Sequence, residues 1–274
     1  MTKRIHVGGV AIGGGAPVSI QSMLNTKTTD VPACLAQLRA LAAAGCQIAR
    51  LAIPDAAAAA AFRHICDASP LPLVADIHFD YRLAIAAAEA GAAKIRINPG
   101  NIGGEDRVRA VVDCCRMHKI PIRIGVNGGS LERRLLEKYG HVTAEALVES
   151  AFSHLALLEK FGFYDTCVSM KSSNVPMMMA AYRSFAAQSD YPLHVGVTET
   201  GTPAQGVLKS AIGIGGLLCL GIGDTIRVSL TADPVQEVIA AKRILKAAGL
   251  RRTGVNLIAC PTCGRTSIDL IGLA

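Results

Sequence analysis

Residues 92–98 read AAKIRIN, a short run in which isoleucine alternates with lysine, arginine and asparagine. Parallel strands covered by helices normally read as continuous apolar runs. A strand with a period of two instead places its isoleucines on one face and its charged residues on the other. The same alternation recurs in IRIGVN at 122–127 and in TIRVS at 225–229. We expect the isoleucine faces to contact helices and the charged faces to point into the mouth of a barrel.

A strand followed by a helix repeats along the chain around these three runs. Short β-branched runs occur at 17–22, 46–52, 71–76, 92–98, 120–126, 164–169, 191–197 and 225–229. Capping signals punctuate the helical segments between them, with Asp30, Asp80, Thr202 and Asp233 at N-termini and Gly45, Gly91 and Gly249 at C-termini. Eight such units in 274 residues predict an α/β fold, a (β/α)₈ TIM barrel, over an open doubly wound sheet. Before the first unit, residues 5–12 (IHVGGVAI) predict an N-terminal hairpin that could close the barrel's lower end.

The composition excludes several classes of protein. With 51% hydrophobic and 18% charged residues, neither disorder nor a coiled coil fits. The longest uncharged apolar stretch, residues 211–222, is too short to cross a bilayer and contains several glycines. No apolar segment of a secretion signal follows Lys3 and Arg4. We therefore expect a cytoplasmic protein without a membrane span.

The net charge is +7 and the pI is near 9.0, a balance that suits an anionic partner. The basic residues are scattered and aromatics make up only 4%, which argues against nucleic acid. Nine cysteines without an export signal do not suggest disulfides. Seven of them lie in apolar segments where cysteine acts as a small hydrophobe: Cys34, Cys46, Cys66, Cys114, Cys115, Cys167 and Cys219.

Polar residues end almost every predicted strand, on the side where barrel enzymes carry their active sites. The charged members are Arg50, Asp76, Arg96, Arg123, Lys171, Glu199 and Arg227. The uncharged or neutral members include His78, Asn98, Asn127, Ser169, Thr198 and Ser229, together with Gln21, Ser22 and Asn25. Five cations against two carboxylates leave an excess of about three positive charges, which is costly in a confined site. A diphosphate would supply comparable negative charge, and guanidinium forks suit its oxygens.

Alternatives remain open for individual residues. Each arginine could instead reach outward along the rim and be solvated, as single surface arginines usually are. His78 could be a general acid, a phosphate donor or a satisfied core histidine.

The last part of the chain carries a second chemical signal. After Gly249, residues 255–266 read VNLIACPTCGRT, which predicts a strand leading into a Cys-x-x-Cys turn outside the barrel repeat. Cys260 and Cys263 at this spacing can hold zinc or an iron–sulfur cluster, or form a redox disulfide. We expect a barrel domain over residues 1–252 and the truncated start of a second domain over residues 253–274.

Several segments together resemble the 4-hydroxy-3-methylbut-2-enyl diphosphate synthase family of the methylerythritol phosphate route to isoprenoids. These segments are APVSIQSMLNTKTTDV, PLVADIHFDYRLA, KIRINPGNIG, IRIGVNGGSL, MKSSNV, VTETGT, GIGDTIRVSLT and CPTCGRT. The resemblance implies reductive ring opening and dehydration of 2-C-methyl-D-erythritol 2,4-cyclodiphosphate through a [4Fe-4S] cluster. Reduced flavodoxin or ferredoxin would be the electron donor. The resemblance also implies that the full-length protein forms a head-to-tail homodimer, in which the cluster domain of one subunit covers the barrel of the other.

The resemblance also implies roles for particular residues. Substrate binding would fall to Arg50, Arg96, Asn98, Arg123, Asn127, Lys171, Ser169, Thr198, Arg227 and Ser229. Catalytic roles would fall to Glu199, Asp76 and His78, with Glu199 as proton donor or orienting group. Cys260 and Cys263 match two of four cluster ligands, while the third cysteine and the glutamate have no counterpart in these residues. The chain as written is therefore expected to be a fragment that is inactive alone.

Two other classes of function stay open. One is a cluster-free barrel enzyme, such as an aldolase or isomerase, that acts on a phosphorylated small molecule and uses Lys171 as a Schiff base. The other is a non-catalytic module that binds anions.

Overall fold

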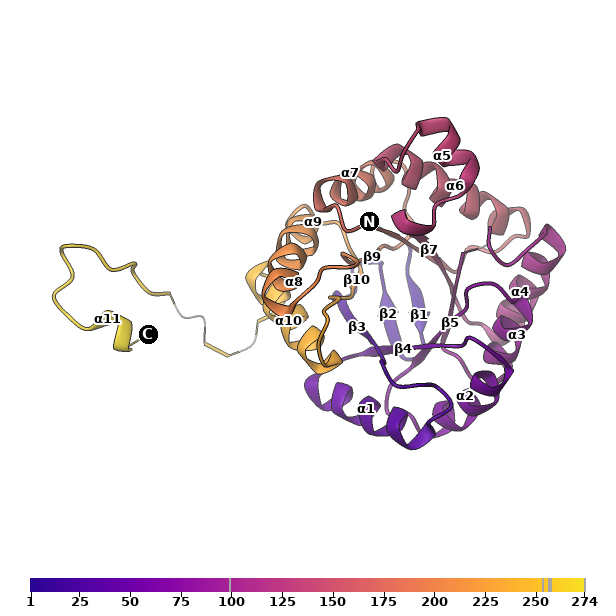
Figure 1. Cartoon of the computed structure of the whole chain (residues 1–274), viewed down its shortest axis with the longest axis horizontal. Coiled ribbons are helices and arrows are strands. Elements are labelled where there is room, and N and C mark those ends of the chain that lie inside the picture. The colour runs from indigo at the N-terminus through magenta and orange to yellow at the C-terminus, as the bar shows by residue number, and fades with distance from the viewer. Residues whose placement is uncertain (99, 253, 256–257, 274) are drawn as a thin grey trace.

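The computed structural model describes residues 1–98, 100–252, 254–255 and 258–273. Eight parallel strands form the central sheet in the order β8-β7-β6-β5-β4-β3-β10-β9. A parallel bridge between Val168 and Leu193 joins the two ends of this order, so the sheet closes into a barrel. Helices surround the barrel on its outside (Figure 1). The predicted (β/α)₈ fold is confirmed.

The elements fall close to the predicted positions. The barrel strands are β3 (Ser19–Met23), β4 (Ile48–Ala52), β5 (Leu73–Asp76), β6 (Lys94–Ile97), β7 (Ile122–Asn127), β8 (Thr166–Lys171), β9 (His194–Val195) and β10 (Thr225–Ile226). The helices are α1 (Val31–Ala44), α2 (Ala56–Ala68), α3 (Tyr81–Glu89), α4 (Glu105–His118), α5 (Arg133–Tyr139), α6 (Ala144–Lys160), α7 (Val175–Ala186), α8 (Pro203–Ser210), α9 (Gly216–Cys219), α10 (Pro234–Ala247) and α11 (Leu270–Leu273). A 3₁₀ turn (Gly128–Ser130) precedes α5, and a π-helical turn (Ala211–Gly215) joins α8 to α9.

The helix boundaries follow the capping residues that the sequence offers. The Asp30 side chain accepts a hydrogen bond from the Ala33 amide at the start of α1, and Asp233 accepts one from the Val235 amide at the start of α10. These bonds satisfy amides that have no partner within the helix. At the end of α1, Gly45 adopts φ +89°, which favours glycine. Capping bonds therefore mark the starts of α1 and α10, whereas Thr202 occupies the N-cap position of α8 without a side-chain capping bond.

The N-terminal hairpin closes the lower end of the barrel, as the sequence suggested. Strands β1 (Ile5–Val7) and β2 (Val10–Ile12) pair antiparallel. Their buried side chains pack with Ile48, Val74 and Cys167, which are inward-facing residues near the starts of three barrel strands. An apolar plug below leaves the opposite end of the barrel as its mouth (Figure 1).

The two faces of each strand have different surroundings. The outward-facing residues of β6, Ile95 and Ile97, belong to the large apolar core between strands and helices. The inward-facing residues Lys94 and Arg96 are also buried. The period-two alternation in the sequence thus separates an apolar outer layer from a polar barrel interior.

The segment after α10 forms no strand among its described residues 254–255 and 258–263, so the strand expected there is wrong for those positions. Residues 256–257 of that expected strand lie outside the described residues. Figure 1 shows the following segment, including α11, away from the barrel. Within the described part of the chain, none of the helices has both the length and the apolar character needed to cross a membrane.

Candidate active site

The five cations named from the strand ends converge inside the barrel mouth. Arg50, Arg96 and Arg123 come from β4, β6 and β7, Lys171 from β8, and Arg227 follows β10. Burial lowers the pKa of Lys171 well below its ordinary value, and the charges of the four arginines lower it further. Arg96, Arg123 and Lys171 are buried, and the side chains of Arg50 and Arg227 are only 11% and 17% exposed. The alternative of separate, solvated arginines on the rim is therefore wrong, and we call these five side chains the cationic site.

The carboxylate of Asp76, at the end of β5, contacts two arginines of the cationic site, Arg50 and Arg96. Its Oδ1 accepts a hydrogen bond from Arg96 Nη1 at 3.1 Å, and its Oδ2 lies 3.8 Å from Arg50 Nε and 3.4 Å from His78 Nε2. Burial alone would raise the pKa of Asp76. Arg50, His78, Arg96 and Arg123 outweigh burial and hold that pKa well below its usual range. Asp76 is therefore a permanent anion that holds two guanidinium groups in place.

Two glycines make room for the long cations. A Cβ at Gly125 would collide with the guanidinium group of Arg96, which also donates to the Gly125 carbonyl at 3.1 Å. A Cβ at Gly196 would lie 3.0 Å from Lys171 Nζ and 2.6 Å from the Arg227 carbonyl oxygen. Strand β7 thus has no side chain where Arg96 passes over it, and the segment after β9 has none where Lys171 passes over it.

Three buried cations have no carboxylate partner among the described residues: Lys94, Arg123 and Lys171. Arg123 is 1% exposed, and its Nε and Nη1 have no hydrogen-bond partner. A buried polar group without a partner costs free energy unless a ligand or water satisfies it. Strands β6 to β8 therefore carry buried positive charge that no carboxylate of the described residues balances.

Lys94 lies two residues before Arg96 on β6, so it sits one level deeper in the barrel. It is fully buried, and its Nζ donates to Gln21 Oε1 at 3.3 Å. The strand alternation pointed Lys94 into the barrel, but it was not counted among the site residues. Burial, followed by the effects of neighbouring charges, lowers the pKa of Lys94 to about 8.

This shift predicts a pH-dependent gain in stability for Lys94→Met. Because the pKa of Lys94 is about 8 in the folded chain and about 10.4 in the unfolded chain, its buried charge costs the folded state about 3 kcal/mol below pH 8. That cost shrinks as the pH rises and disappears near the unfolded pKa. We expect urea unfolding to show Lys94→Met more stable at pH 7, with a smaller gain at pH 10. Lys160→Met, on the exposed surface, is the control. A gain that does not vary with pH would contradict this account.

His194 on β9 adds a neutral group to the cationic interior. It is fully buried, and neither ring nitrogen has a partner in the described structure. Burial lowers its pKa well below the ordinary value, and Arg123, Lys171 and Lys94 lower it further. The imidazole is therefore uncharged at neutral pH and can accept a hydrogen bond from a neighbouring cation or from water.

The uncharged candidates lie along the same strand ends. Asn98 is buried after β6, and Asn127 ends β7 with its amide oxygen oriented to accept from Arg96 Nη2 at 3.0 Å. Ser169 on β8 is buried and donates to the Ile124 carbonyl. Ser229 accepts from Arg227 Nη1 at 2.8 Å. These groups surround the cations with hydrogen-bonding partners.

Two of the three catalytic candidates are more exposed than the cations. The His78 side chain is 54% exposed, so the interpretation of this residue as a core histidine is wrong. Glu199 is exposed, lies in the loop after β9 and has φ +54°, a conformation rare for residues other than glycine. With Thr198 and Asn127 it lines a cavity of about 480 Å³ beside the 3₁₀ turn. Glu199 thus faces a space next to the cationic site, and Asp76 lies within that site.

Sequence reasoning missed two acid networks, one on the buried Glu237 and one on the half-buried Glu132. Glu237 on α10 pairs with Arg227 at 2.9 Å. Glu132, just before α5, lies 2.9 Å from His154 Nε2, which also lies 2.7 Å from Asn98 Oδ1. Both acids sit in helical or loop segments, where a lone glutamate is usually solvated. Only the three-dimensional packing brings them to the strand ends.

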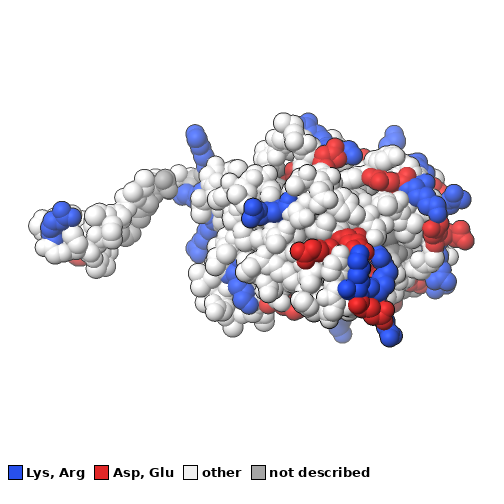
Figure 2. Space-filling model, turned by 90° about the horizontal axis from the view of Figure 1, so that it is seen from above, with Lys and Arg blue, Asp and Glu red and all other residues white. Residues whose placement is uncertain are grey.

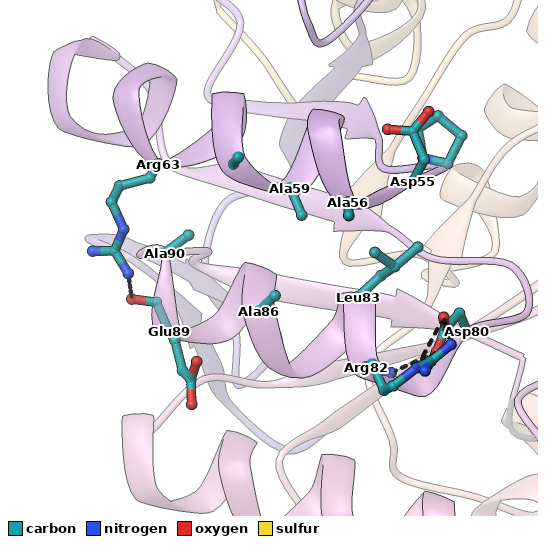
Figure 3. A pocket seen from close by; sticks show the side chains of 12 residues that line it. Asp55, Ala56, Ala59, Arg63, Asp80, Arg82, Leu83, Ala86, Glu89 and Ala90 are labelled. Carbon is teal, nitrogen blue, oxygen red and sulfur yellow. Dashed lines mark hydrogen bonds and ion pairs between the residues drawn. The ribbon is translucent and has the colours of Figure 1, made fainter.

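One sizeable cavity lies away from the mouth. A groove of about 830 Å³ runs between α2 and α3 on the outer wall, lined by small side chains such as Ala59 and Ala86 (Figure 3). Its charged groups are already engaged, since Arg82 pairs with Asp80 at 2.8 Å and Arg63 donates to the Glu89 carbonyl. None of the described residues that line this groove has a buried side-chain polar atom without a hydrogen-bond partner, unlike Arg123 inside the barrel.

The outer surface and the tail differ from the mouth. On the face shown in Figure 2, positive and negative side chains are interspersed among larger uncharged areas. Cys260 and Cys263 are exposed thiols in the segment after the barrel. Within the described residues, no group of three or more histidine, cysteine, aspartate or glutamate side chains is placed to hold a metal ion. The described residues therefore do not form a complete cluster site.

Fold and site together define a (β/α)₈-barrel protein with a group of buried and half-buried cations at the carboxyl ends of its strands. A family model described as the GcpE TIM-barrel domain matches residues 2–242. The chain belongs to this family, as the resemblance implied.

Curated relatives support this assignment. The chain is 56% identical over 273 residues to the 4-hydroxy-3-methylbut-2-en-1-yl diphosphate synthase (flavodoxin) of Geobacter sulfurreducens, covering 100% of this chain and 77% of the relative. The enzyme of the same name from Ruminiclostridium cellulolyticum is also 56% identical, with the same coverage.

Solved structures with lower sequence identity share the fold alone. The dihydropteroate synthase of Yersinia pestis in a sulfonamide drug complex matches with a TM-score of 0.66 and 13% identity, covering 90% of this chain and 99% of that one. The truncated 3-deoxy-D-arabino-heptulosonate 7-phosphate synthase of Thermotoga maritima matches with a TM-score of 0.62 and 14% identity, covering 90% and 94%.

Proposed function

We propose that the barrel mouth binds 2-C-methyl-D-erythritol 2,4-cyclodiphosphate, and that the full-length form carries out its reductive ring opening and dehydration to 4-hydroxy-3-methylbut-2-enyl diphosphate. The observation that carries the proposal is the set of buried cations without carboxylate partners, Arg123 and Lys171 above all. The relatives' names, which specify a diphosphate synthase and flavodoxin, support the same assignment.

The two phosphoryl groups would be held by different sets of residues. Arg123 and Lys171, assisted by Asn127 and Ser169, would grip one of them, because these cations lack other partners. Arg227 and Ser229 would hold the second. Arg50, Arg96, Asn98, Thr198 and His78 would complete the shell.

The ring opening consumes two electrons and two protons and releases one water. Glu199 is our candidate for the group that delivers or orients a proton, because it lines the cavity beside the cations and is open to solvent. Asp76 does not suit proton donation, since neighbouring cations keep it ionised. We assign it the role of holding Arg50 and Arg96 for the substrate.

The electrons would come from reduced flavodoxin, with ferredoxin as the alternative, in the cytoplasm. A [4Fe-4S] cluster would need about four ligands, and Cys260 and Cys263 are our candidates for two of them. A second copy of the full-length enzyme would complete the site as a homodimer. Binding of the cyclodiphosphate requires only the barrel residues, so it can be tested with this chain.

Calorimetric titration of the 274-residue chain with the cyclodiphosphate tests the proposal. We expect saturable binding to one site per chain, with inorganic pyrophosphate as a competitor. Arg82→Ala removes an exposed arginine from the outer groove and should leave the affinity within about twofold. No heat of binding, or equal loss of affinity in Arg82→Ala, would overturn the proposal. A purely anion-binding module would also bind the cyclodiphosphate without turning it over. Turnover by the full-length form would exclude that class of function.

A further inference from the structure

Glu237 is a buried glutamate that the proposed reaction does not use directly. It lies on the first turn of α10, outside the strands, and is 3% exposed. Its carboxylate accepts hydrogen bonds from three residues on two segments of the barrel, β3 and the segment after β10. The donors are Arg227 (Nη2 to Oε1, 2.9 Å; Nε to Oε2, 3.2 Å), Ser22 (Oγ to Oε2, 3.1 Å) and the Leu230 amide (N to Oε1, 3.1 Å).

These contacts fix the direction of the Arg227 guanidinium group. Nε and Nη2 both donate to Glu237, in the paired geometry that holds a guanidinium plane most firmly. The remaining nitrogen, Nη1, donates to Ser229 Oγ at 2.8 Å. The Leu230 amide, next to Ser229, is held by the same carboxylate. One side chain from a helix thus sets the positions of Arg227 and of the segment that carries Ser229.

Charge alone does not account for a carboxylate at this position. A negative charge beside Arg227 reduces the attraction of that arginine for an anion. Arg123 on β7 and Lys171 on β8 have no such partner among the described residues. Glu237 therefore weakens the local positive field while it orders the groups that face the ligand.

We propose that Glu237 is a positioning residue, which holds Arg227 and Ser229 in the orientation that receives one phosphoryl group of the substrate. This inference rests on the proposed function only for the identity of the ligand. The ordering of Arg227 itself is a property of the ligand-free protein.

The sign of the effect of Glu237→Gln separates positioning from charge compensation. Loss of the paired contact leaves Arg227 free to adopt other rotamers, so we expect cyclodiphosphate affinity to fall about tenfold or more. If Glu237 served only to neutralise Arg227, removal of its charge would tighten binding. Glu105→Gln, which breaks the exposed pair between Glu105 and Lys160 on the outer wall, is the matched control and should bind like the unaltered chain.

A double-mutant cycle assigns the effect to Arg227. In a chain that already carries Arg227→Gln, adding Glu237→Gln should weaken cyclodiphosphate binding by less than about twofold, because the group that Glu237 positions is gone. Additive losses would overturn the inference. Should Glu237→Gln fail to fold, Glu237→Asp keeps the charge but shortens the reach, and it should weaken binding in the same direction. Unchanged affinity in a folded Glu237→Asp chain would likewise contradict positioning.

A measurement without ligand keeps this inference separate from the proposed function. The Nε–H signal of Arg227 in ¹H–¹⁵N spectra can be identified by its loss in Arg227→Gln. In the unaltered chain this proton should exchange with solvent at least about tenfold more slowly than it does in Glu237→Gln. Equal exchange in the two chains would overturn the ordering of Arg227. If exchange differs but no chain binds the cyclodiphosphate, the assignment of the ligand fails and the ordering stands.

Discussion

Arg123→Met is expected to stabilise the unliganded chain and to weaken cyclodiphosphate binding by about a hundredfold. Arg123 is buried, two of its guanidinium nitrogens have no partner, and no carboxylate pairs with it among the described residues. Burial, followed by repulsion from Arg50 and Arg96, lowers its pKa to about 9. Replacement of such a charge by an apolar side chain of similar volume should gain about 1 to 4 kcal/mol of unfolding free energy.

The same change removes charge-assisted hydrogen bonds to the ligand, each worth about 1.5 to 3 kcal/mol. Urea unfolding and calorimetry of one preparation measure both effects. Arg82→Met, on the outer wall, is the control and should alter neither quantity by more than about 0.5 kcal/mol. A destabilised Arg123→Met chain with unchanged affinity would show that Arg123 is structural and not part of a ligand site.

Asp76→Asn is expected to produce the opposite effect on stability, a loss of about 3 to 5 kcal/mol at neutral pH. The substitution keeps the shape of the side chain but leaves Arg50 and Arg96 without the buried anion that holds them. Affinity for the cyclodiphosphate should also fall, because both guanidinium groups lose their fixed positions. Thermal unfolding and calorimetry measure the two losses.

The pH dependence of this loss follows from the direction of the pKa shift. The pKa of Asp76 is lowered in the folded state, so its stabilising contribution is fully present above its unfolded pKa of about 3.9. As the pH falls below that value, the unaltered chain loses the contribution and Asp76→Asn does not. The two chains should therefore converge in stability toward low pH. A difference that persists undiminished well below pH 3 would show that Asp76 acts through packing and not through its charge.

The barrel and its cationic mouth could be predicted from sequence because strand alternation has a period of two. In KIRI of β6, that period sends Ile95 and Ile97 to the helices and Arg96 to the interior. The same rule applies to β7 and to the end of β10. It identifies the inward side chains without showing how they pair.

Partner choice inside the mouth depends on tertiary packing, which sequence patterns do not encode. Glu237 pairs with Arg227 because α10 packs back onto β3 and β10, and nothing local distinguishes it from a solvated helix glutamate. The contact between His154 and Asn98 joins residues 56 positions apart. The charge predicted for the barrel mouth from sequence therefore included Glu199, which is exposed, and omitted the buried residues Lys94 and Glu237.

A crystal structure of the chain with the cyclodiphosphate tests the central claim most directly. The account predicts both phosphoryl groups inside the barrel mouth, with oxygens within hydrogen-bond distance of Arg123 and Lys171 and the previously unpartnered Arg123 nitrogens satisfied. A ligand bound elsewhere, such as in the groove between α2 and α3, with Arg123 still without a partner, would contradict it.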